Sequence, residues 1–382
     1  MDEEYIFANF NDSDDDEIQQ QIKYRFKNRI IYNQPNDFHE RFRFTHRQAE
    51  LLLQALGNKL DAISATNHSI SNKQKLLTAL RFYASNDFYY SIGDSMGMSA
   101  NSVCTIIKKV TKAILETFIH MIDWPVEEYE CRRIAARFSQ LARPYGMPQV
   151  AGALDGTLID IVAPADSGGV FIGRNRRTAL NVLGVTDGRN KFLFISARFP
   201  ASVHDQRVLR KTLGVRFDGG YRPFKNCILL GDSAYKATDW LVPMKEGILN
   251  PMHKLFYAAH AGTRWPIESL WGIFKNRFIC LKAFNIWLLI SMYKFKGARG
   301  HGPLRFQNPE VSASVILACA CLQNWLVDNR FEDENDDKEF EENNIEIISN
   351  KNDGYNEEPE DNRVEQQIKT FIEFNQLEKI EI

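Results

Sequence analysis

The sequence predicts an α/β protein in which an all-helical part precedes a part of mixed strands and helices. Apolar residues between 42 and 125 recur every three or four positions, which is the period of an amphipathic helix. After residue 146, short apolar runs alternate with turn residues and helical patterns, as in a mixed sheet with flanking helices. A chain of 382 residues with 44% hydrophobic residues can form two such domains, each with its own core.

Changes in composition divide the chain into four expected regions. They are a polar tail at 1–41, a helical domain at 42–125, an α/β domain at 146–330 and an acidic tail at 331–382. We expect the acidic tail to be disordered, with a weak partner-binding helix formed by Ile368, Phe371, Ile372 and Leu377. Acidic ends enclose a locally basic middle, so the net charge of −2 argues neither for nor against nucleic acid.

The helical domain contains a pattern typical of a helix-turn-helix. The stretch from Tyr89 to Val110 reads as a helix, a Gly turn and a second helix that Ser99 would cap. In that interpretation Asn101 and Lys108 face outward, where a recognition helix contacts DNA. An ordinary helical hairpin explains the same pattern, and the segment alone leaves both explanations open.

The α/β domain is expected to contain four strands and three principal helices. The strands are predicted at 150–162, 181–185, 192–199 and 227–231, with a hairpin turn at Asp187-Gly188. Helices are predicted to begin at His204 and at Pro266, and a final apolar helix to cover 311–327.

The cysteine spacing, the N-terminal residues and the length of the apolar run 286–292 exclude several protein classes. Six cysteines without a CxxC pair indicate reduced thiols of an intracellular protein rather than a zinc finger. The N-terminus lacks the pattern of a signal peptide. The apolar run 286–292 is too short for a membrane span, which needs about 20 residues, so no membrane association is expected.

Three carboxylates are the candidate catalytic residues. Asp155 and Asp232 stand where an apolar strand runs into glycine, and Glu268 lies on an amphipathic helix in a basic stretch. Hydrolysis of a phosphodiester is slow until divalent metals activate the water and neutralise the leaving oxygen. Mg²⁺ prefers carboxylate oxygens, so this set predicts a site for two Mg²⁺ or Mn²⁺ ions.

Neighbouring charges extend this candidate site. Arg264, Lys275 and Arg277 surround Glu268 in the sequence and are candidate phosphate contacts. Asp205 follows a predicted strand and is either a fourth acidic group near the metals or an ordinary helix cap.

A phosphatase interpretation of Asp155-Gly-Thr is excluded by the preceding residues. Haloacid-dehalogenase-type phosphatases need a nucleophilic Asp two residues before the Asp of that motif. Ala153 occupies this position here.

An ordered set of motifs between about residues 40 and 330 resembles the PIF/Harbinger superfamily of DDE transposases, especially the Harbinger transposase-derived nucleases. The matching motifs are Asp155-Gly-Thr, Gly173-Arg-Asn-Arg, Val203-His-Asp-Gln-Arg-Val, Leu230-Gly-Asp-Ser-Ala-Tyr235, His260-Ala-Gly-Thr-Arg264, Trp271-Gly, Phe274-Lys-Asn-Arg-Phe, Gly302-Pro-Leu-Arg-Phe-Gln-Asn-Pro and Ala318-Cys-Ala-Cys-Leu-Gln-Asn. The resemblance implies an RNase H-like catalytic domain in which Asp155, Asp232 and Glu268 bind metal. It also implies Asp205 as a further metal contact, action on DNA in the nucleus and a Myb/SANT-like partner protein.

The chain departs from the family pattern at two places. Residues 283–297 form an insertion before Gly302-Pro-Leu-Arg-Phe, and Leu322-Gln-Asn replaces Leu-His-Asn. Two functions therefore stay open: a metal-dependent DNA endonuclease, with or without strand transfer, and a domesticated DNA-binding or protein-interaction module without catalysis. The intact carboxylates favour the nuclease, whereas the insertion favours the inactive module.

Overall fold

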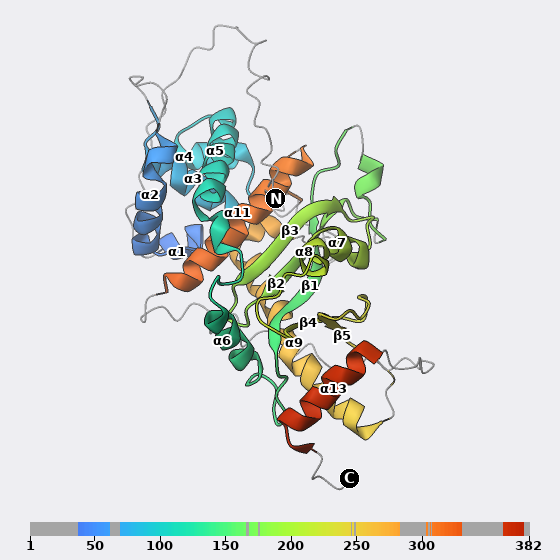
Figure 1. Ribbon diagram of the computed structural model, residues 1–382. Helices are drawn as coiled ribbons and strands as arrows, with labels where there is room; N and C mark the ends of the chain where they lie inside the picture. The colour runs from blue at the N-terminus through green and yellow to red at the C-terminus, as the bar shows by residue number, and fades with distance from the viewer. Residues whose placement is uncertain are drawn as a thin grey trace. The chain divides into compact units, whose positions relative to one another are not determined.

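A computed structural model of the chain describes residues 37–61, 69–165, 168–174, 176–245, 247, 250–282, 303–304, 306, 308–330 and 362–377 (Figure 1). The expected insertion at 283–297 and most of the expected N-terminal tail lie outside these residues. The chain divides into two compact units, each discontinuous in sequence. The first comprises Met1–Ile119, Asp160–Gly168 and Arg277–Cys319, and the second comprises His120–Ile159, Gly169–Asn276 and Ala320–Ile382.

The first unit is helical, as its apolar period predicts. Its helices are α1 (Phe38–Phe42), α2 (His46–Leu60), α3 (Asn72–Ser85), α4 (Tyr89–Met96) and α5 (Ala100–Phe118), with η3 (Ile279–Leu281) and the first part of α11 (Pro309–Asp328). Thr45 and Ser71 each open a helix with a capping box, which satisfies backbone N–H groups that have no partner inside the helix.

Helices α4 and α5 form the expected helix, Gly turn and Ser-capped helix. Gly97 ends α4 in the left-handed region at φ 70°, and the Ser99 hydroxyl accepts a hydrogen bond from the Ser102 N–H. Asn101 and Lys108 are exposed on α5, while its apolar face is buried. This arrangement suits a recognition helix, and DNA contact by Asn101 and Lys108 stays a prediction.

The second unit is built on a mixed five-stranded sheet of order β3-β2-β1-β4-β5. The strands are β1 (Val150–Asp160), β2 (Ala179–Thr186), β3 (Phe192–Pro200), β4 (Ile228–Gly231) and β5 (Leu241–Pro243). β2 and β3 form the expected antiparallel hairpin, whereas β4 runs parallel to both β1 and β5. This mixed sheet with flanking helices confirms the predicted fold class and is consistent with an RNase H-like fold.

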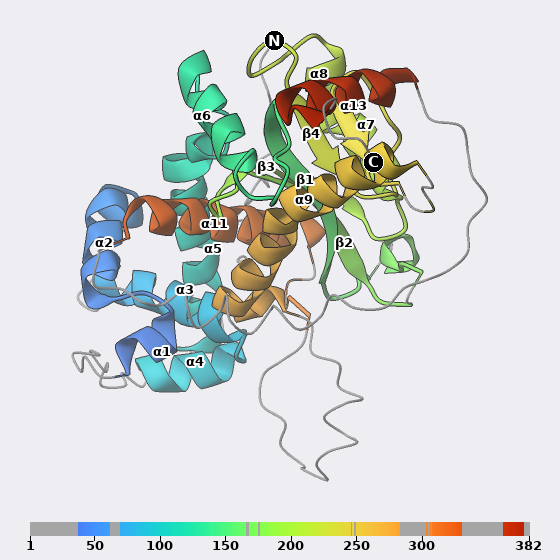
Figure 2. The same ribbon diagram turned by 90° about the horizontal axis from the view of Figure 1, so that it is seen from below.

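Several helices complete the second unit. They are α6 (Glu128–Phe138), α7 (Asp205–Lys211), α8 (Leu213–Asp218), α9 (Pro251–Arg277) and α13 (Asn362–Phe374), with the short turns η1 (Ile119–Met121) and η2 (Gly168–Phe171) at its boundaries. α9 crosses one face of the sheet (Figure 2), where the Trp271 and Phe192 ring centroids lie 5.3 Å apart. Gly184 of β2 admits this indole, because a Cβ there would come within 2.7 Å of it.

The prediction that a helix begins at Pro266 is wrong. α9 begins at Pro251, and Pro266 lies inside it. Proline has no N–H to offer the carbonyl of Gly262, and its ring crowds the preceding turn. Gly262 has no side chain to crowd that turn further, and Pro266 itself is buried, so packing against the sheet keeps the helix continuous.

The prediction of disorder over 331–382 is wrong for residues 362–374. They form α13, an amphipathic helix whose buried Phe371 ring packs against Phe256 of α9 with centroids 5.4 Å apart. The Asn375 side chain then exchanges two hydrogen bonds with the Gly146 backbone. The apolar face of α13 is therefore used inside its own unit, where it covers one end of α9.

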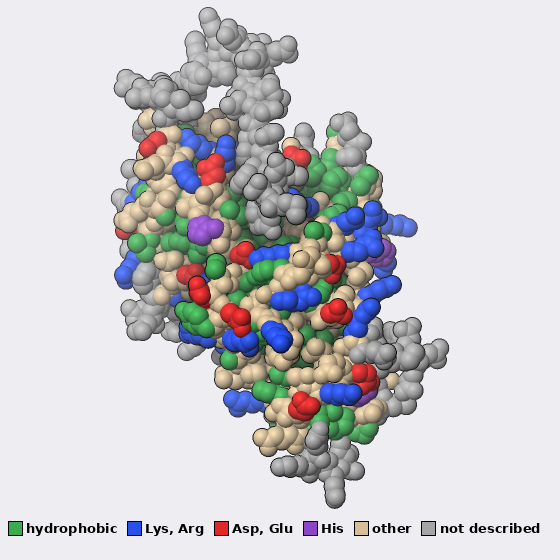
Figure 3. Space-filling model, in the orientation of Figure 1, with side chains coloured by type: hydrophobic (Ala, Val, Ile, Leu, Met, Phe, Trp, Pro, Cys, Tyr) green, Lys and Arg blue, Asp and Glu red, His purple; other side chains and the backbone are tan. Residues whose placement is uncertain are grey.

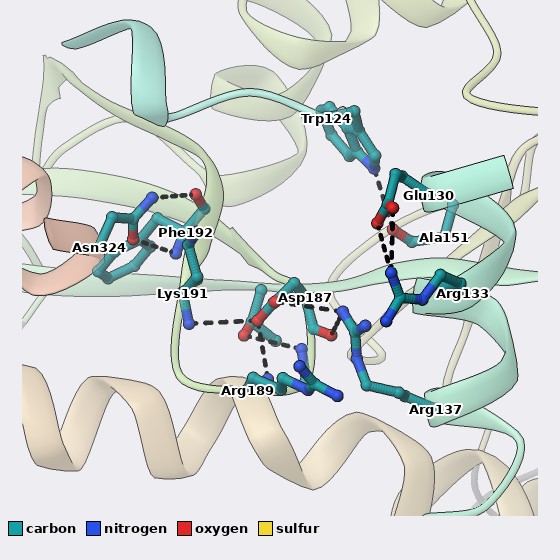
Figure 4. A network of polar contacts seen from close by, with 12 residues as sticks. Trp124, Glu130, Arg133, Arg137, Ala151, Asp187, Arg189, Lys191, Phe192 and Asn324 are labelled. Atoms are coloured by element: carbon teal, nitrogen blue, oxygen red, sulfur yellow. Dashed lines mark hydrogen bonds and ion pairs between the residues drawn. The ribbon is translucent and has the colours of Figure 1, made fainter. Parts of the chain in front are cut away.

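A polar network fixes the β2–β3 turn and the edge of β3 (Figure 4). The Asp187 carboxylate accepts hydrogen bonds from the backbone N–H groups of Arg189 and Lys191, and Arg137 pairs with it at 3.3 Å. The Asn324 side chain of α11 donates a hydrogen bond to the Phe192 carbonyl and accepts one from the Phe192 N–H. It therefore satisfies the backbone at the edge of β3 in the way that a neighbouring strand would.

Helix α11 is long and apolar enough to cross a membrane by length and composition alone. However, 78% of its most apolar window is buried inside the protein, which is typical of a core helix.

Candidate functional site

The sheet places Asp155 and Asp232 on neighbouring parallel strands. Ala153 of β1 pairs with Leu230 of β4, and each aspartate lies two residues beyond its member of that pair. Side chains two apart on a strand point to the same face, so this register brings the two carboxylates to one level of the sheet. Asp155 lies at the point where β1 changes from buried to half-buried, and Asp232 follows the last residue of β4.

Helix α9 brings Arg264 and Glu268 to these aspartates. The Arg264 guanidinium forms an ion pair with Glu268 one helical turn away, and its Nη1 atom lies 4.0 Å from Asp155 Oδ1. Asp155 and Glu268 therefore face the same guanidinium group. The side chains of Arg264 and Asp155 are 16% and 21% exposed, whereas that of Glu268 is 43% exposed, so solvent screens the Arg264–Glu268 pair more than the Arg264–Asp155 interaction.

Asp205 joins the same group from α7. Its Oδ1 atom accepts a 2.6 Å hydrogen bond from Asn181 of β2. A Cβ at Gly156 would lie 3.1 Å from that oxygen, which places Asp205 directly beside β1. His204 holds the cap position of α7, so Asp205 does not serve as the helix cap. We refer to Asp155, Asp205, Asp232 and Glu268 as the acidic cluster.

Burial and the charges of neighbouring carboxylates disfavour ionisation of Asp155 and Asp232. Burial raises the pKa of Asp155 to about 7, to which the charges of Asp232 and Glu268 add and against which Arg264 acts. Burial also raises the pKa of Asp232, although a hydrogen bond from the Ala234 N–H and the charge of Arg264 oppose that rise. One guanidinium therefore compensates the cluster incompletely.

Tyr235 is a member of this site that the sequence reasoning assigned no role. Its side chain is buried, and its hydroxyl has no hydrogen-bond partner among the described residues. A Cβ at Gly156 would lie 3.5 Å from that hydroxyl. Burial, and then the charges of Asp205, Asp155 and Asp232, raise the pKa of Tyr235 far above its usual range. The sequence signal that could have identified Tyr235 is its position three residues after Asp232.

The donor chemistry of the acidic cluster fits a hard divalent cation, because it offers carboxylate oxygens with excess negative charge. In the described parts of the chain, however, no three His, Cys, Asp or Glu side chains lie close enough together to hold one metal ion. Arg264 instead neutralises Glu268 and faces Asp155. The oxygen donors of the acidic cluster therefore suit a divalent cation. In the structure, however, Asp155 and Glu268 face the Arg264 guanidinium instead.

The other predicted phosphate contacts have different surroundings. The Lys275 ammonium group donates to the Thr157 hydroxyl at 2.5 Å and to the Leu158 carbonyl at 3.3 Å, so it ties α9 to β1. Arg277 is half-buried as the last residue of α9. Contact between DNA and Arg264, Lys275 or Arg277 stays a prediction.

A pocket of about 250 Å³ adjoins Asp205, with Thr157, Arg174 and His204 among its lining residues. Figure 3 shows Lys and Arg side chains gathering at the right of the molecule, near α7 and the segment before β2. Five exposed arginines of these elements and of β3 form what we call the arginine surface: Arg174, Arg176, Arg177, Arg198 and Arg207. Positive charge beside a carboxylate site is what a phosphodiester substrate requires.

Comparisons with known proteins identify the family to which the chain is similar. Residues 154–324 match the family described as DDE superfamily endonuclease, a range that includes Asp155, Asp205, Asp232 and Glu268. The chain is 30% identical over 274 residues to the protein of Homo sapiens named "Putative nuclease HARBI1", covering 72% of both chains. It is 26% identical over 279 residues to "Protein ALP1-like" of Arabidopsis thaliana, covering 69% of this chain and 63% of that one. No solved structure matches the chain.

Proposed function

This chain belongs to the DDE superfamily endonucleases, among the Harbinger transposase-derived nucleases, and on that premise we propose that it is a metal-dependent DNA endonuclease. The observation that carries the proposal is the acidic cluster, in which β1, α7, α9 and the end of β4 hold four carboxylates near enough for their charges to interact, beside an arginine surface. Half-buried negative charge of this kind, at Asp155 and Asp232 above all, is costly unless a ligand compensates it.

Asp155 and Asp232 would hold the cations, Glu268 would complete the set, and Asp205 would add a further oxygen ligand. When bound, a divalent cation pair activates the attacking water and neutralises the leaving oxygen of the phosphodiester. Asn181 orients Asp205 through its 2.6 Å hydrogen bond, and Lys275 holds α9 against β1, so both position the ligand-bearing elements.

Arg264 would have two successive partners. In the free protein it neutralises Glu268 and faces Asp155. Once cations compensate those carboxylates, the guanidinium would be released to bind the anionic phosphate, which it can contact through two parallel N–H donors. This exchange reconciles the predicted phosphate contact of Arg264 with its carboxylate partners in the structure.

Further parts of the proposal rest on family membership. They are a Myb/SANT-like partner that selects the DNA site, action in the nucleus and strand transfer by a DNA 3′-hydroxyl. Asn101 and Lys108 on α5 would add contacts to DNA, since both are exposed beyond the Gly turn.

The alternative function is a domesticated DNA-binding or protein-interaction module that has lost catalysis. One observation favours it: no three ligating side chains among the described residues gather at one point. The two functions differ in one property, because only the nuclease breaks phosphodiester bonds.

Cleavage of supercoiled plasmid by the full-length protein tests the proposal. Wild type is expected to nick the plasmid with Mg²⁺ or Mn²⁺ and to be inactive in EDTA. Asp232→Asn and Glu268→Gln should each lose at least about a hundredfold in rate, since each removes a charged ligand. Asp239→Asn, which changes an exposed aspartate outside the cluster, is the matched control and should cleave as wild type does. Equal rates for wild type and both cluster variants would refute the nuclease function.

A further inference from the structure

The Tyr235 hydroxyl is a buried polar group that lies among the aspartates of the acidic cluster. Tyr235 is 4% exposed, and no described atom lies in hydrogen-bonding geometry with its hydroxyl. An unpaired buried hydroxyl costs about 1–3 kcal/mol, so folded proteins rarely keep one without a use for it.

The surroundings of this hydroxyl identify what it can bind. It lies next to Gly156, on the same side as Asp205 Oδ1, and the charges of Asp205, Asp155 and Asp232 all act on it. A phenol beside carboxylates remains protonated at neutral pH and is therefore a hydrogen-bond donor. Two cluster oxygens already accept other hydrogen bonds: Asn181 donates to Asp205 Oδ1, and the Ala234 N–H donates to Asp232 Oδ1. Among the described residues, no oxygen of the acidic cluster accepts a hydrogen bond from the Tyr235 hydroxyl.

The shape of the site keeps this donor available. Gly156 leaves space beside the hydroxyl, since a Cβ there would crowd Asp205 Oδ1 at 3.1 Å. Gly231 leaves space for the Tyr235 ring, since a Cβ there would lie 2.9 Å from that ring. Two glycines on adjacent strands thus allow the ring to be buried with its hydroxyl among the aspartates.

We propose that Tyr235 is a positioning residue whose hydroxyl donates a hydrogen bond to an oxygen atom that enters the acidic cluster with its ligand. This inference rests on the proposed function and deepens it. The entering oxygen belongs either to the hydration shell of a divalent cation or to a phosphate of the DNA. Both are strong acceptors for a phenolic donor.

Tyr235→Phe tests the inference, because it removes only the hydroxyl. In the absence of ligand the variant should be as stable as wild type or more stable, since the unpaired group disappears. Its affinity for Mn²⁺, measured by titration calorimetry, should fall by about three- to tenfold if the oxygen comes with the cation. If the oxygen belongs to DNA, Mn²⁺ affinity should be unchanged, and the same loss should appear for a DNA duplex bound in Ca²⁺.

Tyr83→Phe is the matched control. Tyr83 is also buried, but its hydroxyl makes a 2.7 Å hydrogen bond with the Thr111 hydroxyl, in the first unit. That variant should lose about 1 kcal/mol of stability and bind Mn²⁺ and DNA as wild type does.

The possible failures are distinguishable. If wild type binds neither cation nor DNA, the proposed function fails and this inference fails with it. If wild type binds both and Tyr235→Phe binds both equally well, the inference alone is overturned. A loss of stability like that of Tyr83→Phe would also overturn it, because it would show that the hydroxyl has a partner in the free protein.

Discussion

At the scale of single residues, the site combines groups that stabilise the fold poorly. Asp155 is half-buried near Asp232 and Glu268, with one guanidinium facing it. Tyr235 keeps a buried hydroxyl that has no hydrogen-bond partner among the described residues. Uncompensated charge and an unpaired polar group at a few clustered residues are typical of a site shaped for a ligand rather than for stability.

Asp155→Asn is accordingly expected to raise stability while it abolishes cleavage. A pKa near 7, compared with 3.8 in the unfolded chain, means that the folded state disfavours the charged carboxylate. A neutral amide avoids that cost, so the free energy of unfolding should rise by roughly 2–4 kcal/mol in EDTA at neutral pH. Urea denaturation of both proteins checks this, and a destabilised Asp155→Asn variant would contradict it.

At the scale of elements, α9 decides the geometry of the site. It carries Arg264 and Glu268, and Lys275 and Trp271 fix it to the sheet. His260, one turn before Arg264, is fully buried, and its Nε2 lies 2.9 Å from the Val242 carbonyl of β5. This bond needs a proton on Nε2, and it ties α9 to β5.

The same histidine predicts a loss of stability in acid. Burial lowers the pKa of His260 to about 4, while an unfolded histidine titrates near 6.5. Between these values the unfolded chain binds the extra proton, so stability falls as the pH drops through this window. The stability advantage of wild type over His260→Gln should shrink by about 2 kcal/mol between pH 7.5 and pH 5.

Denaturation of both proteins at the two pH values measures this change. His120→Gln, at an exposed histidine of the second unit, is the control and should run parallel to wild type. A constant difference between wild type and His260→Gln would show that the buried ring does not govern acid stability.

At the scale of the whole molecule, the net charge is small, and charged side chains of one sign gather on local surfaces instead. A net charge of −2 gives no general attraction to DNA, so the proposed binding depends on local surfaces. The arginine surface adjoins the acidic cluster at the pocket that Arg174 and Asp205 both line. Under the proposed function, the arginines would bind the phosphates of DNA and the acidic cluster would bind the cations.

Replacing Arg176 and Arg207 with alanine should weaken DNA binding without affecting the fold, since both side chains are exposed. The slope of log affinity against log salt should decrease by about one for each lost phosphate contact. Fluorescence anisotropy at several salt concentrations measures that slope. Arg132 and Arg133 of α6, which pair with Glu128 and Glu130, are the control positions. Equal slopes for both double variants would exclude the arginine surface from DNA binding.

The sequence by itself determined the fold class, most strands and helices, and the residue types of the candidate site. Hydrophobic period and turn residues act locally, so a strand such as 227–231 or a cap such as Ser99 can be read from neighbouring positions. The tertiary structure decided what depends on contacts between distant segments. It paired Arg264 with the carboxylates, kept α9 continuous through Pro266, folded α13 onto α9 and left the Tyr235 hydroxyl unpaired. These features follow from burial and from the sharing of charge across strands, which no local pattern records.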